Sequence, residues 1–283
     1  MFQDFKIIAS SMGDLPPSPA VAARLLKELK NPNLSVKDLA KLVSVEPAVT
    51  AKIMKMANSA LYGQLGQITT LERAIIVIGE NNLKRAVMDI SLRNVNKSHG
   101  LLERWLWENS VGCAVGARLA AERLSSAPPE EAFIAGLFRH IGKTIMLNRD
   151  RDLYRKVVKL HERGEVPLHD GERALFAFSH EMVGAALLEH WNFPPRLVSV
   201  VRHHHDFESV RESDPEVFHL AATVSLGAEF CRYFGIGPRQ KKVKIDLPST
   251  DAARSLGLTM EELEPLLDEF IHLFHEERSL FLA

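Results

Sequence analysis

The sequence has only two cysteines among its 283 residues, Cys113 and Cys231, and both lie among apolar residues at helical spacing. Two such cysteines make no disulfide framework, so the sequence predicts buried, reduced thiols. The N-terminus lacks the basic segment, apolar core and small-residue cleavage site of a secretion signal. No apolar run reaches the roughly 18–20 residues of a membrane-spanning helix. These absences predict a cytoplasmic protein with no membrane association.

The sequence also lacks an excess of charge of either sign, with 35 basic residues against 36 acidic ones and a formal net charge of −1. A chain without a strong overall field is a poor match to nucleic acid, although a local basic patch stays possible. The hydrophobic fraction of 46% and the charged fraction of 25% are typical of soluble globular proteins.

Apolar residues recur at helical spacing along nearly the whole chain, which predicts an all-α protein. Capping residues and prolines mark several helix starts, among them Ser35, Asp214 and Thr259. Val243, Ile245 and Leu247 alternate with polar residues and weakly indicate a short strand. We expect helices over residues 47–57, 70–78, 81–93, 101–124, 130–139, 179–191, 195–205 and 216–234, and a last one from 259 towards 275.

A polar stretch at residues 94–100, ending in glycine, marks a subdomain boundary. We expect an N-terminal helical bundle over residues 1–97, packed on a second helical subdomain over residues 98–234. A C-terminal extension with a terminal helix follows over residues 235–283.

Five of the twelve histidines fall at expected helix ends or starts in the central part of the chain, where they could converge: His140, His180, His203, His204 and His205. Converging imidazoles suit zinc, iron, nickel and similar divalent ions. Consecutive helical residues point about 100° apart, so at most two of the last three can share one site. The plainer alternative is that these are helix-terminal residues, which helix C-termini favour.

The chain resembles the HDOD domain family over about residues 12–230. The segments that carry the resemblance are 15–20, 46–63, 68–75, 78–79, 107–110, 132–137, 140–143, 180–184 and 202–205, of which the run Asn-Ser-Ala-Leu-Tyr-Gly at 58–63 is the most specific. The resemblance implies a bacterial regulatory module whose second half is a degenerate relative of the HD-domain and HD-GYP phosphohydrolases.

An HD-type phosphohydrolase holds its metal with a first histidine, a His-Asp pair and a later aspartate. In this chain the resemblance places Ser110, the pair His140-Ile141 and Thr223 at these positions. Isoleucine cannot bind a cation, and serine and threonine carry no charge to offset that of a dication. We therefore expect no catalytic residues, no enzyme activity and no cofactor, with a divalent metal at the remaining histidines as an alternative.

The resemblance implies signal transduction through a signalling protein partner, as in the output module of a response regulator. A nucleotide or metal at the remnant pocket could gate it, and the candidate ligand or interaction residues are Asn58, Ser59, Tyr62 and Lys143. For the first three, an ordinary helix C-terminus with a buried tyrosine is an equal alternative. The main rival function is a metal-dependent phosphohydrolase acting on cyclic dinucleotides or nucleotides.

A second rival is a DNA-binding regulator, because residues 35–57 have the pattern of a helix-turn-helix. Lys52 and Lys55 would then contact phosphates from the second helix. Apolar residues on that helix leave few side chains for base edges, and the same pattern is typical of a plain helical bundle. We therefore expect no nucleic-acid partner.

Overall fold

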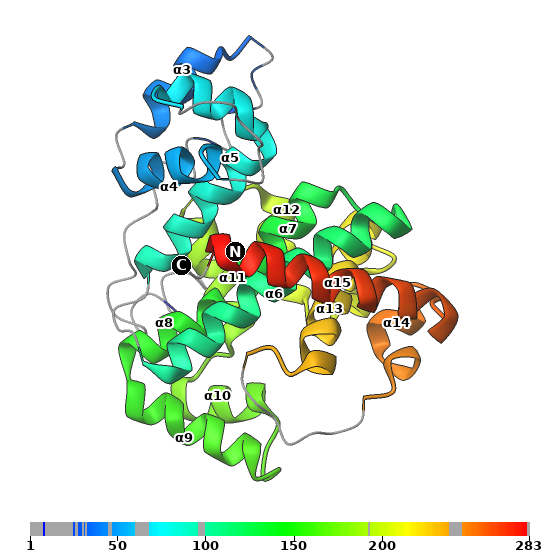
Figure 1. The fold of residues 1–283 in the computed structure, drawn as a ribbon. Coiled ribbons are helices and arrows are strands. Elements are labelled where there is room, and N and C mark those ends of the chain that lie inside the picture. The colour runs from blue at the N-terminus through cyan, green and yellow to red at the C-terminus, as the bar shows by residue number, and fades with distance from the viewer. Residues whose placement is uncertain are drawn as a thin grey trace. The chain divides into compact units, whose positions relative to one another are not determined.

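A computed structural model of the chain describes residues 8, 25, 28–29, 31, 33–44, 47–59, 68–95, 100–191, 193–237 and 245–281. Every regular element in these residues is a helix, which confirms the predicted all-α class (Figure 1). The chain forms two compact units: Met1–Pro16, Val95–His190 and Pro194–Ala283 make the larger, and Pro17–Asn94 with Trp191–Phe193 the smaller. The division predicted at residues 97 and 234 stays a prediction.

The smaller unit contains α3 (Val36–Val43), α4 (Pro47–Ala57) and α5 (Leu71–Val95). Ser35 caps α3 as predicted, because its hydroxyl accepts the Asp38 amide and the Asp38 carboxylate accepts the Ser35 amide. The two helices predicted on either side of residue 79 form one element that breaks at Gly79. The φ of 78° at this position is one that glycine adopts without steric cost.

The larger unit is built around α6 (Leu101–Leu124), whose predicted bounds are confirmed. Helix α6 packs against α7 (Pro129–Phe138), α13 (Pro215–Phe234) and α15 (Met260–Phe281), and Figure 1 shows α15 lying across it. The other helices of this unit are α8 (Ile141–Arg149), α9 (Arg151–Glu162), α10 (Leu168–Phe176), α11 (His180–His190), α12 (Pro195–His203) and α14 (Asp251–Ser255), with 3-10 turns η2 (Phe207–Val210) and η3 (Leu247–Ser249).

Helix ends in the larger unit follow the capping signals of the sequence. The Asp214 carboxylate accepts the Val217 amide at 3.1 Å at the start of α13, and the Glu262 carboxylate accepts the Thr259 amide at 2.8 Å at the start of α15. The weak strand signal was wrong where it can be checked, since Ile245 has no regular structure and Leu247 begins a 3-10 turn. Val243 lies outside the described residues.

The close packing of α8 on α11 requires a glycine at residue 142. A Cβ atom there would lie 2.0 Å from the His180 carbonyl oxygen and 2.8 Å from the Gly184 nitrogen. Both are backbone atoms, so they cannot turn aside as a side chain can. The missing side chain therefore sets the distance between the turn that carries His140 and the start of α11.

Both cysteines are free and buried, as predicted. The Cys113 thiol on α6 donates to the Val224 carbonyl of α13 at 3.4 Å. Burial raises the pKa of this thiol, so it remains protonated. The two cysteines thus act as small apolar residues where α6 and α13 meet.

We predict that Gly142→Ala destabilises the protein by about 1–3 kcal/mol, the usual cost of overpacking a core. Gly171→Ala is the matched control, because a Cβ atom there makes ordinary contacts of 3.4 Å with Val157 and Val166. Alanine also favours the helix over glycine at that position by up to about 1 kcal/mol. Urea unfolding measures both variants. Equal midpoints would show that the approach of α8 to α11 is not tight.

Candidate functional site

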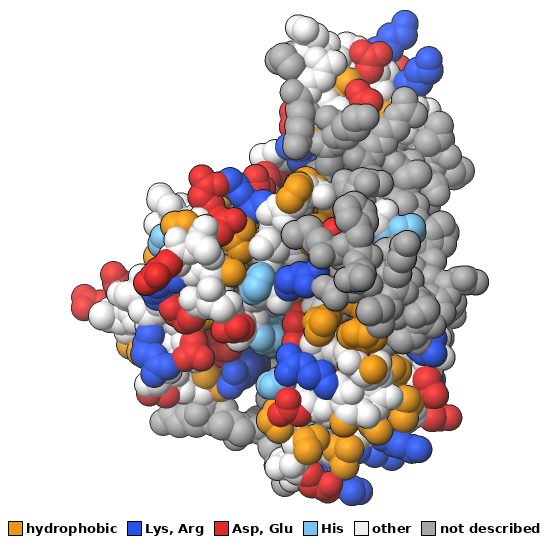
Figure 2. All heavy atoms as spheres, turned by 180° about the vertical axis from the view of Figure 1, so that it is seen from behind, with side chains coloured by type: hydrophobic (Ala, Val, Ile, Leu, Met, Phe, Trp, Pro, Cys, Tyr) orange, Lys and Arg blue, Asp and Glu red, His pale blue; other side chains and the backbone are white. Residues whose placement is uncertain are grey.

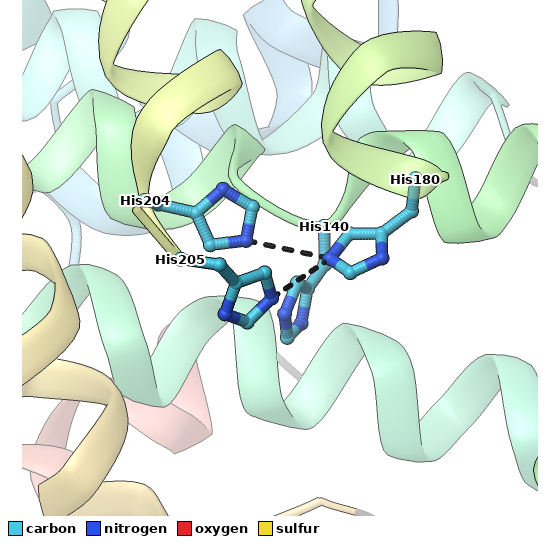
Figure 3. Close-up of side chains that lie close together, drawn as sticks. All are labelled: His140, His180, His204 and His205. Carbon is cyan, nitrogen blue, oxygen red and sulfur yellow. Dashed lines mark hydrogen bonds between the residues drawn. The ribbon is translucent and has the colours of Figure 1, made fainter. Parts of the chain in front are cut away.

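Four histidines from three separate parts of the larger unit meet at one point (Figure 3). His140 lies in the turn between α7 and α8, and His180 is the first residue of α11. His204 caps the C-terminus of α12, and His205 follows it. One ring nitrogen of each lies within 4.8 Å of the others. The structure therefore brings together four of the five histidines that the sequence singled out.

His203 is the histidine left outside this cluster. Its ring Nδ1 contacts the Ser209 hydroxyl at 3.4 Å, away from the other imidazoles. The sequence predicted a helix continuing to residue 205, but α12 ends at His203. His204, the C-cap of α12, and His205, in the turn after it, both reach the cluster.

The ring of His180 is oriented by a buried carboxylate. Glu172 on α10 is fully buried and accepts the His180 Nδ1 proton at 2.7 Å and the His180 backbone amide at 2.9 Å. Its other oxygen accepts the Tyr154 hydroxyl at 3.2 Å. Because Nδ1 must donate, the neutral ring carries its lone pair on Nε2, which faces the cluster (Figure 3).

The ring of His204 is oriented in the same way by the backbone. Its Nδ1 donates to the Val201 carbonyl at 2.7 Å, so the neutral ring also leaves Nε2 without a proton. The Nε2 atoms of His180 and His204 lie 3.4 Å apart, and Nε2 of His205 lies 3.1 Å from that of His180. Three nitrogens therefore converge, and fixed hydrogen bonds leave two of them, those of His180 and His204, with lone pairs that hold no proton.

Burial keeps these imidazoles neutral. It lowers the pKa of His140, His180 and His204 well below 6.5, and the positive charges of Arg139 and Lys143 add to the effect at His140 and His180. A neutral imidazole is the form that binds metal. The cluster can therefore donate several nitrogen lone pairs at neutral pH.

Lys143, on the first turn of α8, contacts the cluster directly. Its Nζ lies 3.0 Å from Nε2 of His140, and the residue is buried. Burial lowers the pKa of Lys143 to about 7, against the opposing charge of Glu172. The other ring nitrogen of His140, Nδ1, is buried and has no hydrogen-bond partner among the described residues.

The cluster reaches the surface through His205, the exposed member of the four. A space-filling view shows histidine side chains at the surface, close to side chains of both charges (Figure 2). His205 is therefore the member of the cluster that solvent reaches.

The residues at the expected ligand positions offer little to a cation. Ile141 is 1% exposed and apolar, and Ser110 is a buried hydroxyl on α6. The Thr223 hydroxyl donates to the His219 carbonyl at 2.7 Å and lies 2.8 Å from the Ser126 hydroxyl. None of the three is a carboxylate or an imidazole.

The carboxylates beside the cluster were missed from the sequence. Glu172 and Glu181 group with His180, and Glu181 Oε2 lies 3.3 Å from the His180 Nδ1. Glu172 comes eight residues before His180 and from another helix, so no spacing rule connects them. The one sequence feature that could have pointed to Glu172 is the position of a carboxylate on the buried side of α10.

The interaction residues proposed near residue 60 belong to the smaller unit. The Asn58 amide group accepts from the Ile68 amide at 2.8 Å and donates to the Ile68 carbonyl at 2.9 Å. Ser59 donates to the Met56 carbonyl at 2.7 Å. Asn58 thus ties together the two ends of the segment 58–68, while Tyr62 lies outside the described residues.

Among the residues described, no helix is long and apolar enough to cross a membrane.

Solved structures share this fold. A crystal structure of an HDOD domain protein of unknown function from Geobacter sulfurreducens has a TM-score of 0.78 at 24% identity, over 99% of this chain and 98% of that one. A Marinobacter aquaeolei VT8 protein, provisionally named a signal transduction protein, has a TM-score of 0.74 at 20% identity, over 95% and 60%. A Shewanella amazonensis SB2B protein, provisionally named a phosphohydrolase, has a TM-score of 0.65 at 21% identity, over 94% and 97%.

A sequence relative, an uncharacterised protein of Treponema pallidum, is 21% identical over 224 residues, which cover 79% of this chain and 44% of that protein. The chain thus spans less than half the length of this curated relative. The family model described as the HDOD domain matches residues 15–207, which is more than half of the chain. The chain therefore belongs to the HDOD domain family.

Proposed function

We propose that this chain is a signal-transduction module that acts by binding a protein partner and does not hydrolyse phosphate esters. A regulatory role fits the HDOD family and the structural neighbour named for signal transduction. The observation that carries the non-catalytic part is Ile141, which stands beside His140 where a hydrolase of this fold needs an aspartate.

The remaining chemistry of the site supports the same proposal. A pair of catalytic metals needs carboxylates that bridge the ions and offset their charge. Glu172 already accepts hydrogen bonds from Tyr154 and His180 through both of its oxygens. A carboxylate held in this way orients an imidazole and does not itself bridge two ions.

The remnant pocket gives such a module a way to respond to a ligand. His205 exposes the cluster to solvent, while Lys143 lies beside His140 inside it. A small ligand bound there would contact α8, α11 and the end of α12 together. In our proposal, occupancy of the pocket changes the surface that the partner binds.

The rival function, a metal-dependent phosphohydrolase, is favoured by the four-histidine cluster and by the name of the Shewanella neighbour. We predict no turnover of bis(p-nitrophenyl) phosphate or of a cyclic dinucleotide when the purified chain is supplied with Mn²⁺ or Fe²⁺. The measurement is product release over hours, with His140→Ala and His203→Ala in parallel. Turnover that His140→Ala abolishes and His203→Ala retains would overturn the non-catalytic proposal.

The DNA-binding alternative depends on Lys52 and Lys55, and the ammonium group of Lys52 forms an ion pair with the buried carboxylate of Asp89. A lysine in such a pair is a poor phosphate ligand. We predict that a labelled duplex shows no mobility shift with the chain at low salt, where phosphate contacts are strongest. A salt-sensitive shift that weakens in the double variant Lys52→Ala, Lys55→Ala would establish DNA binding instead.

A further inference from the structure

Two lone pairs point at each other in the histidine cluster. The Nδ1 protons of His180 and His204 are held by Glu172 and the Val201 carbonyl, so neither Nε2 has a proton to share across the 3.4 Å between them. The proton of His205 can bridge only one such contact. Facing lone pairs in a buried place are unfavourable unless a cation lies between them.

The spacing of these nitrogens matches that of ligands around one metal ion. Imidazole nitrogens bind zinc at about 2.0–2.1 Å, so two of them in a tetrahedral shell lie about 3.3–3.4 Å apart. The measured Nε2 separations from His180 are 3.4 Å to His204 and 3.1 Å to His205. An ion could therefore bind between them with little movement of the rings.

His140 supplies a fourth imidazole. Its ring centroid lies 5.2 Å from that of His180 and 5.6 Å from that of His204, and one of its nitrogens is within 4.8 Å of the other three donors. Its Nδ1 is buried and has no partner among the described residues. An unpartnered buried nitrogen calls for an explanation, and an ion bound by the four imidazoles would supply one.

We infer that His140, His180, His204 and His205 form a closed, all-nitrogen site for one late first-row divalent metal of the zinc class. Four nitrogen donors favour zinc, cobalt or nickel over magnesium and manganese, which prefer oxygen. The shell also has no position left for the water that a catalytic zinc needs. The inference rests on the proposed non-catalytic function and names the ligand of its pocket.

The charged residues around the site, and the hydrogen bond that orients His180, fit this assignment. The buried carboxylates of Glu172 and Glu181 lie next to His180 and offset both the positive charge of the ion and that of Lys143, whose Nζ lies 3.0 Å from Nε2 of His140. The Glu172–His180 hydrogen bond is the carboxylate–imidazole contact that metal-binding histidines commonly make behind the metal. An ion held here would cross-link the start of α11 to the end of α12.

Cobalt binding to the untagged chain tests this site, because four-coordinate Co²⁺ absorbs strongly in the visible range. After chelator treatment and dialysis, we expect one Co²⁺ per chain, displaced by Zn²⁺ and not by Mg²⁺. The variant His205→Ala should lose this absorption. It removes the ligand that is exposed, so the buried core of the protein is left unchanged. Glu172→Gln should weaken affinity about 10–100-fold. His203→Ala, the neighbouring histidine outside the cluster, should bind like the unaltered chain.

The absence of stoichiometric Co²⁺ binding, or equal binding by His205→Ala and the unaltered chain, would overturn the site. Circular dichroism of every variant separates lost ligands from lost folding. A different result would contradict the proposed function. If the zinc-loaded chain hydrolysed bis(p-nitrophenyl) phosphate, the metal site would stand and the proposal of a non-catalytic module would be wrong.

Discussion

The buried carboxylate of Glu172 accepts three hydrogen bonds, from the Tyr154 hydroxyl and from the ring and backbone of His180. Burial raises the pKa of this carboxyl group, and the positive charge of Lys143 opposes that shift. Burying a carboxylate is costly unless each oxygen finds donors, so this network requires α9, α10 and α11 to meet at one place. It fixes the first residue of α11, and with it the direction in which His180 points.

This arrangement separates two properties that are usually considered together in helical phosphohydrolases: the fold that gathers histidines and the charge that activates water. The larger unit retains the first, through the meeting of three chain segments at the cluster. The second depends on carboxylates at particular positions. In the non-catalytic module that we propose it is missing, because Ile141 stands beside His140 where the resemblance to the hydrolases predicts a carboxylate.

Much of the fold could be predicted because helix signals are local. The cap at Ser35, the break at Gly79 and the limits of α6 each depend on residues a few positions apart. The candidate site was predicted in part. His140 and His180 were expected at helix ends, but nothing local shows which of the three histidines at residues 203–205 face the cluster. Glu172 could not be predicted, because only tertiary packing places α10 behind α11.

The two free cysteines give this packing an internal reporter. Cys113 and Cys231 are both 0% exposed, on α6 and α13, the helices that form the centre of the larger unit. An alkylating reagent can reach a thiol in that position only when the helices part, so the rate of labelling reports how often they do. The chain thus carries two natural probes of how often α6 and α13 separate, without any added label.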